Sequence, residues 1–541
     1  MSTNKKILIS ACGMAMAAAA LGSPSSEVNM RPVETARPLS TDAFDYNMNY
    51  PITSRTLGDL LDEPVAGLAP VYDPSDAGSL RSRRIHMNLA VLDRLDPIAG
   101  GRVRFNLFED LAYEAVFERV ETLAVGQSVW YGRLAGIPFA DFILVREGDV
   151  VYATIRDYEN RRCVQIRQRS AAGISVVREM GGGPAARCGN TSGREPAPLD
   201  SEQGGAAGSG WYCGYANDNC DSTFVQDQGP DTDAGYAIDL LVVWTPQARA
   251  EEGGTSEIRS LAVEAYADMN TRLSNSLTTP RVRLVWLEEM TGYTENETDE
   301  LHRLFCPTDG YMDTVHTLRE THQADLVHLI VRDIDDDCGV GCVTAGIAYR
   351  PSSFAESCNS HLYWVSISDN NYSTGTLAHE VGHNLGCCHD HSNGCDNPIV
   401  PYAFGKCFYA FPAYRHTTMS YDCSGGFGDD IPYYSNPDIE VAGEPTGTAN
   451  DEDNARTIDD TRVMIANYRR GDHTRYSGPW LPVNVGNGSQ LLPYSSINLG
   501  VLGVATGGTV RISGGTYPEG PITWTKSVTL ESRGGVVTIG G

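Results

Sequence analysis

Hydrophobic and polar residues alternate between residues 102 and 180, and this pattern predicts a series of short β-strands. A period of two gives each strand one face for a core and one face for solvent. Turn residues such as Gly148 and Asp149 separate the segments, as expected for strands joined by short turns. The clearest segments are RVRFNLF, AVFERVE, DFILVRE, VVYATIRD, CVQIRQ and ISVVRE. Residues 23–188 are therefore predicted to form a β-rich domain.

From residue 236 to residue 470 the pattern changes, because apolar strands now alternate with segments of helical periodicity. The segments IDLLVVWT, RVRLVWLEEM and DLVHLIVR are typical of buried strands. Helical patterns cover residues 247–276, 298–320, 373–386 and 454–468. Strands that alternate with helices predict α/β organisation around a sheet. A Gly-, Ser- and Pro-rich stretch at 189–235 precedes this region and is interpreted as a linker and processing region.

Residues 474–541 form a third region, in which the short β segments VRIS, ITW, VTLES and VVTIG are separated by Gly-rich turns. Brief, evenly spaced strands are typical of the first coils of a right-handed parallel β-helix. Only two or three coils fit, and solenoids need more repeats for independent stability. The tail is interpreted as a structural appendage, with contact to carbohydrate or a surface as the alternative. The chain as a whole is expected to be multidomain.

The N-terminus, MSTNKKILISACGMAMAAAALGS, combines two Lys with an Ala-rich apolar stretch and small residues. This composition is typical of a secretory signal peptide, which predicts cleavage after Gly22 and a secreted, extracellular protein. Lipidation of Cys12 is the alternative. The apolar run is too short for a confident membrane span, and no later segment reaches about 18 apolar residues. No membrane span is therefore expected.

Charge and cysteine content further limit the possible partners and cellular location of the protein. The 541 residues include 69 acidic and 41 basic side chains, for a net charge of −28. Nucleic acids and anionic membranes require basic patches, so neither is expected as a partner. An exported chain keeps disulfides, so most of the 14 Cys are expected to be paired. The adjacent residues Cys387 and Cys388 are expected to bond to two distant partners rather than to each other.

The run AHEVGHNLGCCHD, residues 378–390, carries the chemistry of the chain. His379 and His383 are one helical turn apart and can offer imidazole nitrogens to one ion. Gly386 can adopt positive φ, end the helix and turn the chain back to deliver His389. Three neutral imidazoles leave one position of a tetrahedral zinc open for water, as in a catalytic site. Glu380 follows the first histidine and can serve as general base on that water.

This pattern, followed by a Met-containing turn, resembles the metzincin zinc metalloproteases. The turn is HTTMSYDC, where the resemblance implies that Met419 supports the three histidines from beneath. Asp390 resembles the reprolysin branch and would orient the loop by hydrogen bonding. Tyr421 resembles the astacin and serralysin branches, where this Tyr contacts zinc or the transition state. The mixture is similar to the bacterial peptidyl-Asp metalloendopeptidases and their reprolysin-like relatives, with further matches across roughly residues 236–470.

The resemblance implies an α/β (α+β) metzincin catalytic domain with a mixed sheet, an active-site helix and one catalytic Zn²⁺. It also implies hydrolysis of peptide bonds in protein or peptide substrates, and a propeptide-like N-terminal domain of a zymogen. Arg187-Cys188-Gly189 resembles the cysteine switch of metzincin zymogens, in which a thiolate occupies the open zinc position. A disulfide between Cys188 and Cys163 is the alternative. A stable β domain that is never removed is the alternative to the propeptide.

Three further alternatives remain open. The first is a non-catalytic surface or matrix-binding protein on a metzincin scaffold, against which the intact Glu380 argues. The second is a zinc hydrolase that acts on small peptides or amides. The third concerns Ca²⁺, which the acidic cluster Asp333–Asp337 could bind, although a solvated turn fits its spacing better. The preference for Asp in the relatives' name is not transferred, because the sequence does not define the substrate pocket.

Overall fold

A computed structural model describes residues 6–7, 56–61, 79–95, 101–123, 126–168, 174–180, 237–295, 300–305, 309–334, 345–352, 354, 365–370, 375–393, 395, 397–421, 423, 428–466, 468–469, 474–479, 487–520 and 523–540. The predicted signal peptide, apart from the short strand β1 (Lys6–Ile7), lies outside these residues, as do Cys12, Cys188 and the linker at 189–235. Within them, no helix has the length and apolar character needed to cross a membrane.

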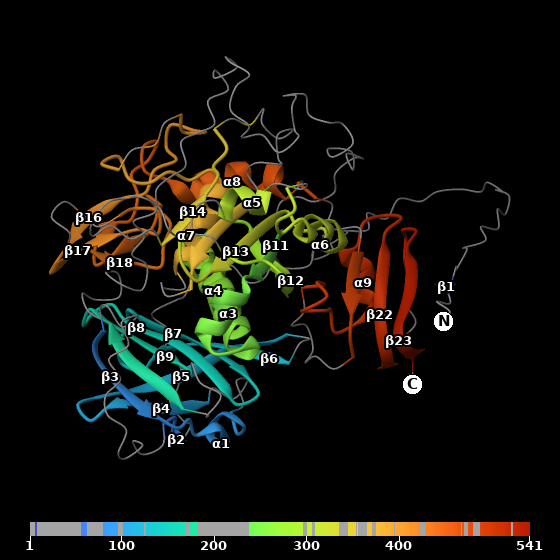
Figure 1. Ribbon diagram of the computed structural model, residues 1–541, viewed down its shortest axis with the longest axis horizontal. Helices are drawn as coiled ribbons and strands as arrows, with labels where there is room; N and C mark the ends of the chain where they lie inside the picture. Colours follow the sequence, from blue (N-terminus) through green and yellow to red (C-terminus); the bar gives the residue numbers. More distant parts are fainter. Residues whose placement is uncertain are drawn as a thin grey trace, which may run out of the picture.

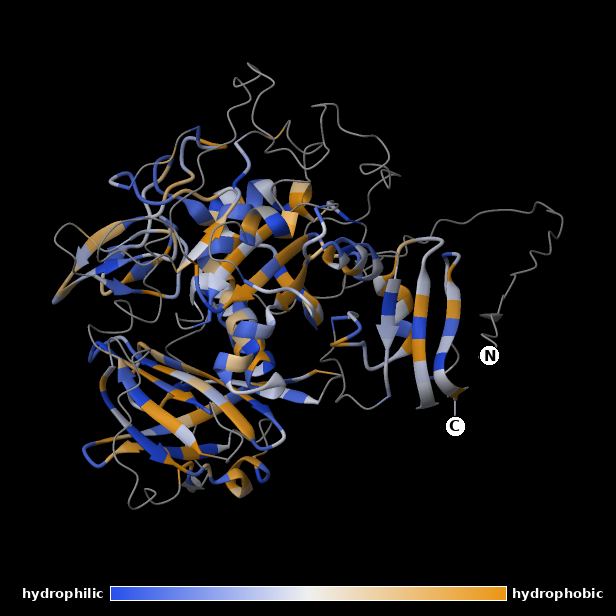
Figure 2. Ribbon diagram, in the orientation of Figure 1, coloured by the Kyte–Doolittle hydropathy of each residue, from blue (hydrophilic) through white to orange (hydrophobic). Residues whose placement is uncertain are grey.

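Nine strands near the N-terminus form one sheet, called the N-terminal sheet below, in the order β2-β4-β5-β6-β7-β8-β9-β10-β3. Its strands are β2 (Thr56–Asp59), β3 (Ser79–Ile85), β4 (Arg102–Phe108), β5 (Leu111–Thr122), β6 (Gln127–Leu134), β7 (Ala140–Glu147), β8 (Val150–Asp157), β9 (Arg162–Arg167) and β10 (Ser175–Met180), with helix α1 (Leu89–Leu92) beside them. All neighbours pair antiparallel except β2 and β4. The strands predicted from the alternating pattern are confirmed, and Figure 2 shows that alternation along them.

One feature of the N-terminal sheet departs from the prediction, because β8 is buried on both faces. Its residues Val151, Ala153 and Ile155 face a core that belongs to the sheet alone. Val150 and Tyr152 belong instead to the core shared with the following region. The alternation that predicted a solvent-facing side is present, but another part of the chain covers that side.

Residues from 237 onward form a five-stranded central sheet in the order β12-β11-β13-β15-β14. Its strands are β11 (Ala237–Trp244), β12 (Arg281–Glu289), β13 (Leu326–Val331), β14 (Gly346–Ala348) and β15 (Val365–Asp369). Four strands run parallel, and β14 pairs antiparallel to β15 at the edge. The sheet is therefore mixed, as the resemblance implied. Helix α4 lies between this sheet and the N-terminal sheet (Figure 1), in contact with β12 on one side and β7 and β8 on the other.

The helices of this region are α3 (Pro246–Glu252), α4 (Thr255–Asn275), α5 (Glu300–Phe305), α6 (Thr314–His322), α7 (Gly375–Asn384) and α8 (Asn454–Ile465). Two predicted helices are each split in two. The helical pattern at 247–276 is interrupted where Gly253 and Gly254 have φ of 106° and 159°, a region that favours glycine. The pattern at 298–320 is divided between α5 and α6, with Pro307 in the intervening sequence and Gly310 at φ 85°.

The segment after α7 contains β16 (Cys407–Ala410), β17 (Ala413–His416), β18 (Asp429–Asp430), β19 (Glu440–Val441) and β20 (Glu444–Pro445). Disulfides join Cys388 to Cys395 and Cys407 to Cys423. The prediction that Cys387 and Cys388 both bond to distant partners is wrong. Cys388 pairs seven residues away, and Cys387 is a free thiol. Cys387 is fully buried in the main core, where its Sγ faces the carbonyl of Asn454 at 3.8 Å.

The tail holds β21 (Thr474–Ser477), α9 (Ile497–Gly503), β22 (Thr509–Tyr517) and β23 (Thr529–Ile539). These three strands pair in parallel and in sequence order, and β1 joins β23 from the other side. A small separate core of α9 and the strands supports them. Parallel pairing of successive strands agrees with the predicted β-helix coils, whose identity stays a prediction.

Candidate active site

Helix α7 brings the first two histidines of the motif together. All ten of its residues are buried, so it passes through the protein rather than over its surface. The helix ends before Gly386, which has φ 92°, as the motif predicted. A Cβ at Gly386 would also approach Ile399 Cγ2 to 3.1 Å. The turn therefore needs glycine for its backbone conformation and for space.

The turn at Gly386 carries His389 back to the two histidines of α7. The Nε2 atoms of His379 and His383 each lie 3.0 Å from Nε2 of His389. Two ligands of a tetrahedral zinc with bonds of about 2.0–2.1 Å are separated by about 3.3 Å. Among the described residues, these three form the group of His, Cys, Asp or Glu side chains whose ligand atoms could hold one metal ion. The donor set fits a single zinc.

Backbone carbonyls fix which nitrogen of two rings faces the centre. Nδ1 of His379 lies 2.7 Å from the carbonyl of Thr418, and Nδ1 of His383 lies 2.9 Å from that of Cys387. A carbonyl only accepts, so each Nδ1 carries the hydrogen and each Nε2 keeps its lone pair for a metal. The tautomer required for zinc binding is therefore set by the protein.

Burial also keeps the three rings neutral. It lowers the pKa of His383 to about 3. Burial and then repulsion from the neighbouring histidines hold the pKa values of His379 and His389 well below the ordinary value. Neutral imidazole is the form that binds a metal ion, so the site does not have to shed protons near neutral pH.

Glu380 packs against the edge strand of the central sheet. Its side chain is 1% exposed. A Cβ built on Gly346 of β14 would lie 2.4 Å from Oε1 and 2.5 Å from Cγ of Glu380. Only glycine at position 346 leaves room for this carboxylate beside the histidines. The sequence did not single out Gly346, because nothing in its neighbourhood marks a contact with a residue 34 positions later.

Met419 lies directly beneath α7. It is fully buried, and a Cβ on Gly382 of the helix would lie 2.4 Å from its Sδ. Gly405 closes the other side, where a Cβ would meet the Met419 carbonyl carbon at 2.9 Å. Gly382 therefore leaves room for the thioether of Met419, and Gly405 leaves room for the backbone of Met419 and Ser420. This is the place that the resemblance implied for Met419.

Asp390 joins the third histidine to the turn that contains Met419. Its carboxylate accepts hydrogen bonds from the backbone N–H of Ser392 at 2.8 Å and of Tyr421 at 3.1 Å. It also accepts from Asn393 Nδ2 at 2.7 Å and Ser420 Oγ at 3.1 Å. One carboxylate thus ties together both loops that flank the site.

The ring of Tyr421 lies over the histidine cluster. Its centroid is 4.2 Å from that of His389 and 5.9 Å from that of His379, and the planes of the Tyr421 and His379 rings are nearly parallel. The side chain is half-buried. Arg350, to which the sequence analysis assigned no role, is a charged neighbour that lowers the pKa of His383 and His389 further, after the larger effect of burial and, for His389, of the other two histidines. Its only signal was its place in the segment GIAYR.

Comparison with known proteins gives independent evidence on the family of this chain. Residues 236–452 match the family of reprolysin-like metallo-peptidases, M12B. The chain is 30% identical over 377 residues to the peptidyl-Asp metalloendopeptidase of Stenotrophomonas maltophilia, covering 66% of this chain and 80% of that protein. It is also 30% identical over 367 residues to the protein of that name from Xanthomonas campestris pv. campestris, covering 65% and 78%.

Among solved structures, the chain is similar to metalloproteinase-II from Bacteroides fragilis. The match has 11% sequence identity and a TM-score of 0.34, and it covers 56% of this chain and 84% of that one. A likeness at that level does not constrain the fold or the chemistry.

Proposed function

Because the chain belongs to the reprolysin-like M12B metallopeptidases and is a zinc metalloendopeptidase, we propose that His379, His383 and His389 hold its catalytic zinc and that Glu380 is its general base and acid. One observation carries the proposal: three buried Nε2 atoms converge while two of the Nδ1 atoms are held by carbonyls. Zinc in that position supplies a Lewis acid that polarises the scissile carbonyl and makes a water more acidic.

The residues around the zinc position have different roles in hydrolysis. Glu380 removes a proton from the attacking water and passes it to the leaving amine. Tyr421, whose ring lies over His389, donates a hydrogen bond to the oxyanion of the tetrahedral intermediate. Gly386, Asp390 and Met419 support the histidines without taking part in the chemistry. The substrates are proteins or peptides, which is what the relatives' name states in general terms.

We further propose secretion and synthesis as a zymogen. Export is supported by the signal-peptide composition of residues 1–22 and by two disulfides in the described part of the chain. Latency is assigned to the region that contains Cys188 and the linker at 189–235. Cys163 is disulfide-bonded, and if its partner is Cys188, the thiolate switch is excluded. Mass spectrometry of the non-reduced protein decides between the two.

The C-terminal tail is assigned a structural role. Its three parallel strands and α9 share a small core of their own. Contact with carbohydrate is the alternative, and retention of the tail on insoluble polysaccharide would favour it. The acidic cluster Asp333–Asp337 stays a candidate for Ca²⁺, although residues 335–337 lie outside the described residues.

The decisive experiment is cleavage of unfolded casein by purified protein with and without a zinc chelator. Glu380→Gln should abolish activity while one zinc per chain remains bound. Glu440→Gln, an exposed acid in β19, is the matched control and should cleave as wild type does. Zinc-loaded, processed wild type that cleaves neither casein nor a diverse peptide library would overturn the proposal in favour of the scaffold alternative.

A further inference from the structure

Helix α4 has a polar stripe that is buried. Polar side chains recur every three or four residues along one face of the helix: Glu257, Ser260, Glu264, Asp268, Thr271, Arg272 and Asn275, all buried. A stripe with this spacing usually faces water, opposite the apolar face that packs on the core. Here α4 lies against β7 and β8 of the N-terminal sheet (Figure 1), and the end of the stripe, at Arg272 and Asn275, meets the segment after α7. The polar face of α4 is therefore covered by other parts of the same chain rather than by water.

The N-terminal sheet meets this stripe with matching charge. Arg156 on β8 is paired with Asp268, and Arg167 Nη2 on β9 lies 3.5 Å from Glu264 Oε2. All four side chains are at most 3% exposed. The hydroxyl of Tyr152 donates to Glu252 on α3 at 2.6 Å. Charges buried to this extent persist only when they are paired, so the two surfaces fit each other specifically.

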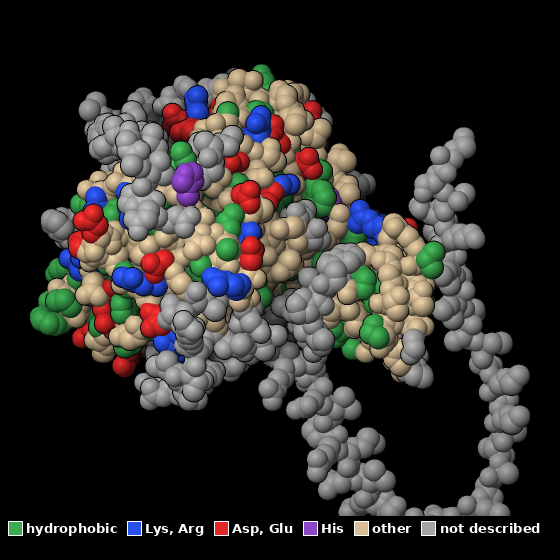
Figure 3. All heavy atoms as spheres, turned by 90° about the horizontal axis from the view of Figure 1, so that it is seen from below, with side chains coloured by type: hydrophobic (Ala, Val, Ile, Leu, Met, Phe, Trp, Pro, Cys, Tyr) green, Lys and Arg blue, Asp and Glu red, His purple; other side chains and the backbone are tan. Residues whose placement is uncertain are grey.

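Apolar contacts continue across the same interface. Val129, Ile143, Val145 and Val150 of the N-terminal sheet belong to one hydrophobic cluster together with α4 and the central sheet. Figure 3 shows the molecule from the side of the N-terminal sheet, with acidic and basic side chains interspersed on that outer face. The face turned toward α4 thus combines apolar side chains with buried arginines, as expected of a lasting interface.

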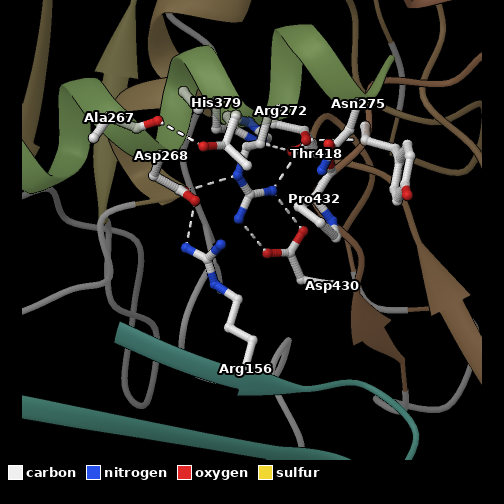
Figure 4. A network of polar contacts seen from close by, with 12 residues as sticks. Arg156, Ala267, Asp268, Arg272, Asn275, His379, Thr418, Asp430 and Pro432 are labelled. Atoms are coloured by element: carbon white, nitrogen blue, oxygen red, sulfur yellow. Dashed lines mark hydrogen bonds and ion pairs between the residues drawn. The ribbon is translucent and has the colours of Figure 1, made fainter. Parts of the chain in front are cut away.

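The ion pair at Asp268 continues toward the site. Figure 4 shows Arg156 and Arg272 on either side of the Asp268 carboxylate, with Nε of Arg272 at 2.9 Å. The opposite edge of the Arg272 guanidinium binds both oxygens of Asp430, at 2.9 and 2.6 Å. Burial alone would raise the pKa of Asp268, but the two arginines hold it below the ordinary value. Two carboxylates therefore fix the plane of Arg272.

Arg272 in turn reaches a residue that positions a histidine of the site. Its Nη1 donates to Thr418 Oγ1 at 3.0 Å, and the carbonyl of Thr418 accepts from Nδ1 of His379 at 2.7 Å. Thr418 Oγ1 also donates to the Tyr433 carbonyl at 3.0 Å. A continuous path of buried polar contacts thus runs from Arg156 on the N-terminal sheet to His379 (Figure 4).

We propose that the N-terminal sheet is a lasting part of the active protease and that Arg156 is a positioning residue for His379, acting through Asp268, Arg272 and Thr418. The proposal rests on His379 being a zinc ligand, as argued above. Cutting the chain between residues 181 and 236 would then relieve latency without releasing the sheet. Loss of Arg156 would leave the carboxylates of Asp141 and Asp268 without the guanidinium between them, and Arg272 would shift toward them.

A double-mutant cycle on zinc affinity tests the path. The variants are Arg156→Gln, Thr418→Val and both together, and the zinc dissociation constant is measured by competition with a chromophoric chelator. Thr418→Val keeps the carbonyl that accepts from His379 but removes the hydroxyl that Arg272 contacts, so it should weaken zinc binding roughly tenfold, the lower end of the effect of losing an orienting partner, and Arg156→Gln about threefold. The double variant should fall short of the product of the two effects by about threefold, because one path carries both.

The matched control breaks an ion pair of the same interface away from the path. Arg259 pairs with Glu147 near the start of α4, so Arg259→Gln should lower thermal stability but leave the zinc dissociation constant within about twofold. Arg156→Lys, which keeps the charge, covers the case in which Arg156→Gln does not fold, and it should show a weaker effect of the same kind. Independent, multiplicative effects of Arg156 and Thr418 would overturn the path.

A second experiment tests whether the sheet stays bound. A recognition site for a specific protease is inserted within residues 189–210 of the full chain, and the cut protein is passed over a size-exclusion column in dilute buffer. Co-elution of both fragments with one zinc supports the proposal. Separation of the N-terminal sheet from a C-terminal fragment that binds zinc with unchanged affinity overturns it. An uncut wild type that binds no zinc would instead refute the proposed function, so the two failures are distinguishable.

Discussion

The contact between Gly346 and Glu380 allows a sharp prediction for the variant Gly346→Ala. The added methyl group would lie 2.4 Å from Oε1, 2.5 Å from Cγ and 2.6 Å from Cδ of Glu380, and it would be attached to the backbone of the edge strand β14. Ordinary contact begins at 3.4 Å. To relieve this overlap, either the carboxylate of Glu380 moves away from β14 or β14 moves away from α7. We expect the carboxylate to move, because it lies at the end of a flexible side chain.

The displacement needed is about 1 Å, which sets the magnitude. A misplacement of about 1 Å in a catalytic group can cost roughly 100-fold in rate, or about 2.7 kcal/mol of transition-state stabilisation. We therefore expect kcat to fall by about 100-fold while KM changes little. The three atoms nearest to the new methyl group all belong to Glu380, so zinc content should stay at one per chain.

The assay is steady-state cleavage of a quenched fluorescent peptide, with zinc measured on the same preparation. Gly520→Ala is the control, because no atom lies within 4 Å of a Cβ at that glycine, and it should be indistinguishable from wild type. An unchanged kcat in Gly346→Ala would refute the argument that the position of Glu380 limits the reaction. Loss of zinc would show that the methyl group acts on the metal site instead.

Three more outcomes can be checked with variants at other positions. Asp390→Asn should weaken zinc binding roughly 10- to 100-fold in chelator competition, whereas Asp438→Asn, an exposed acid, should not. Gly382→Ala should destabilise by about 1–3 kcal/mol in urea unfolding, because overlap with Met419 Sδ outweighs the helix propensity of Ala. Burial lowers the pKa of His328 to about 3. The free energy of unfolding should therefore fall as pH drops from about 6.5 toward 3, by up to about 1.4 kcal/mol per unit, and His328→Asn should flatten that slope.

The site was predictable from sequence to the extent that its geometry is local. Spacing along one helix places His379 and His383, and a single turn at Gly386 returns His389, so a run of eleven residues encodes the three nitrogens. Three strands of the central sheet, β11, β12 and β13, were predictable for a similar reason, because each carries its own apolar run, whereas the short strands β14 and β15 carry none and were not predicted. Contacts such as that between Gly346 and Glu380 depend on how β14 and α7 pack, and no local pattern reports that.

The dependence on packing between distant segments also explains why the disulfide pairing was not predicted. The signal-peptide composition predicted an exported chain whose cysteines are mostly paired, but not that Cys388 would pair with Cys395 while Cys387 stays reduced. Two adjacent residues point in different directions at a helix end. Cys388 turns toward the loop that follows, and Cys387 turns into the main core, where burial raises the pKa of its thiol. The choice is set by the direction of the chain after Gly386, which the composition does not contain.

The polar stripe of α4 shows most clearly what a periodic pattern leaves open. The spacing of the polar residues is the same whether that face meets water or another layer of the chain. Either environment can supply hydrogen bonds and opposite charge to Asp268 and Arg272. The difference lies in a partner 112 residues earlier, Arg156, which the alternating pattern of β8 presented as an ordinary solvent-facing residue. If the cut protein keeps its N-terminal sheet, that arginine belongs to the mature enzyme. If the protein is also made as a zymogen, as proposed above, a search for the inhibitory residue should then begin between residues 181 and 236.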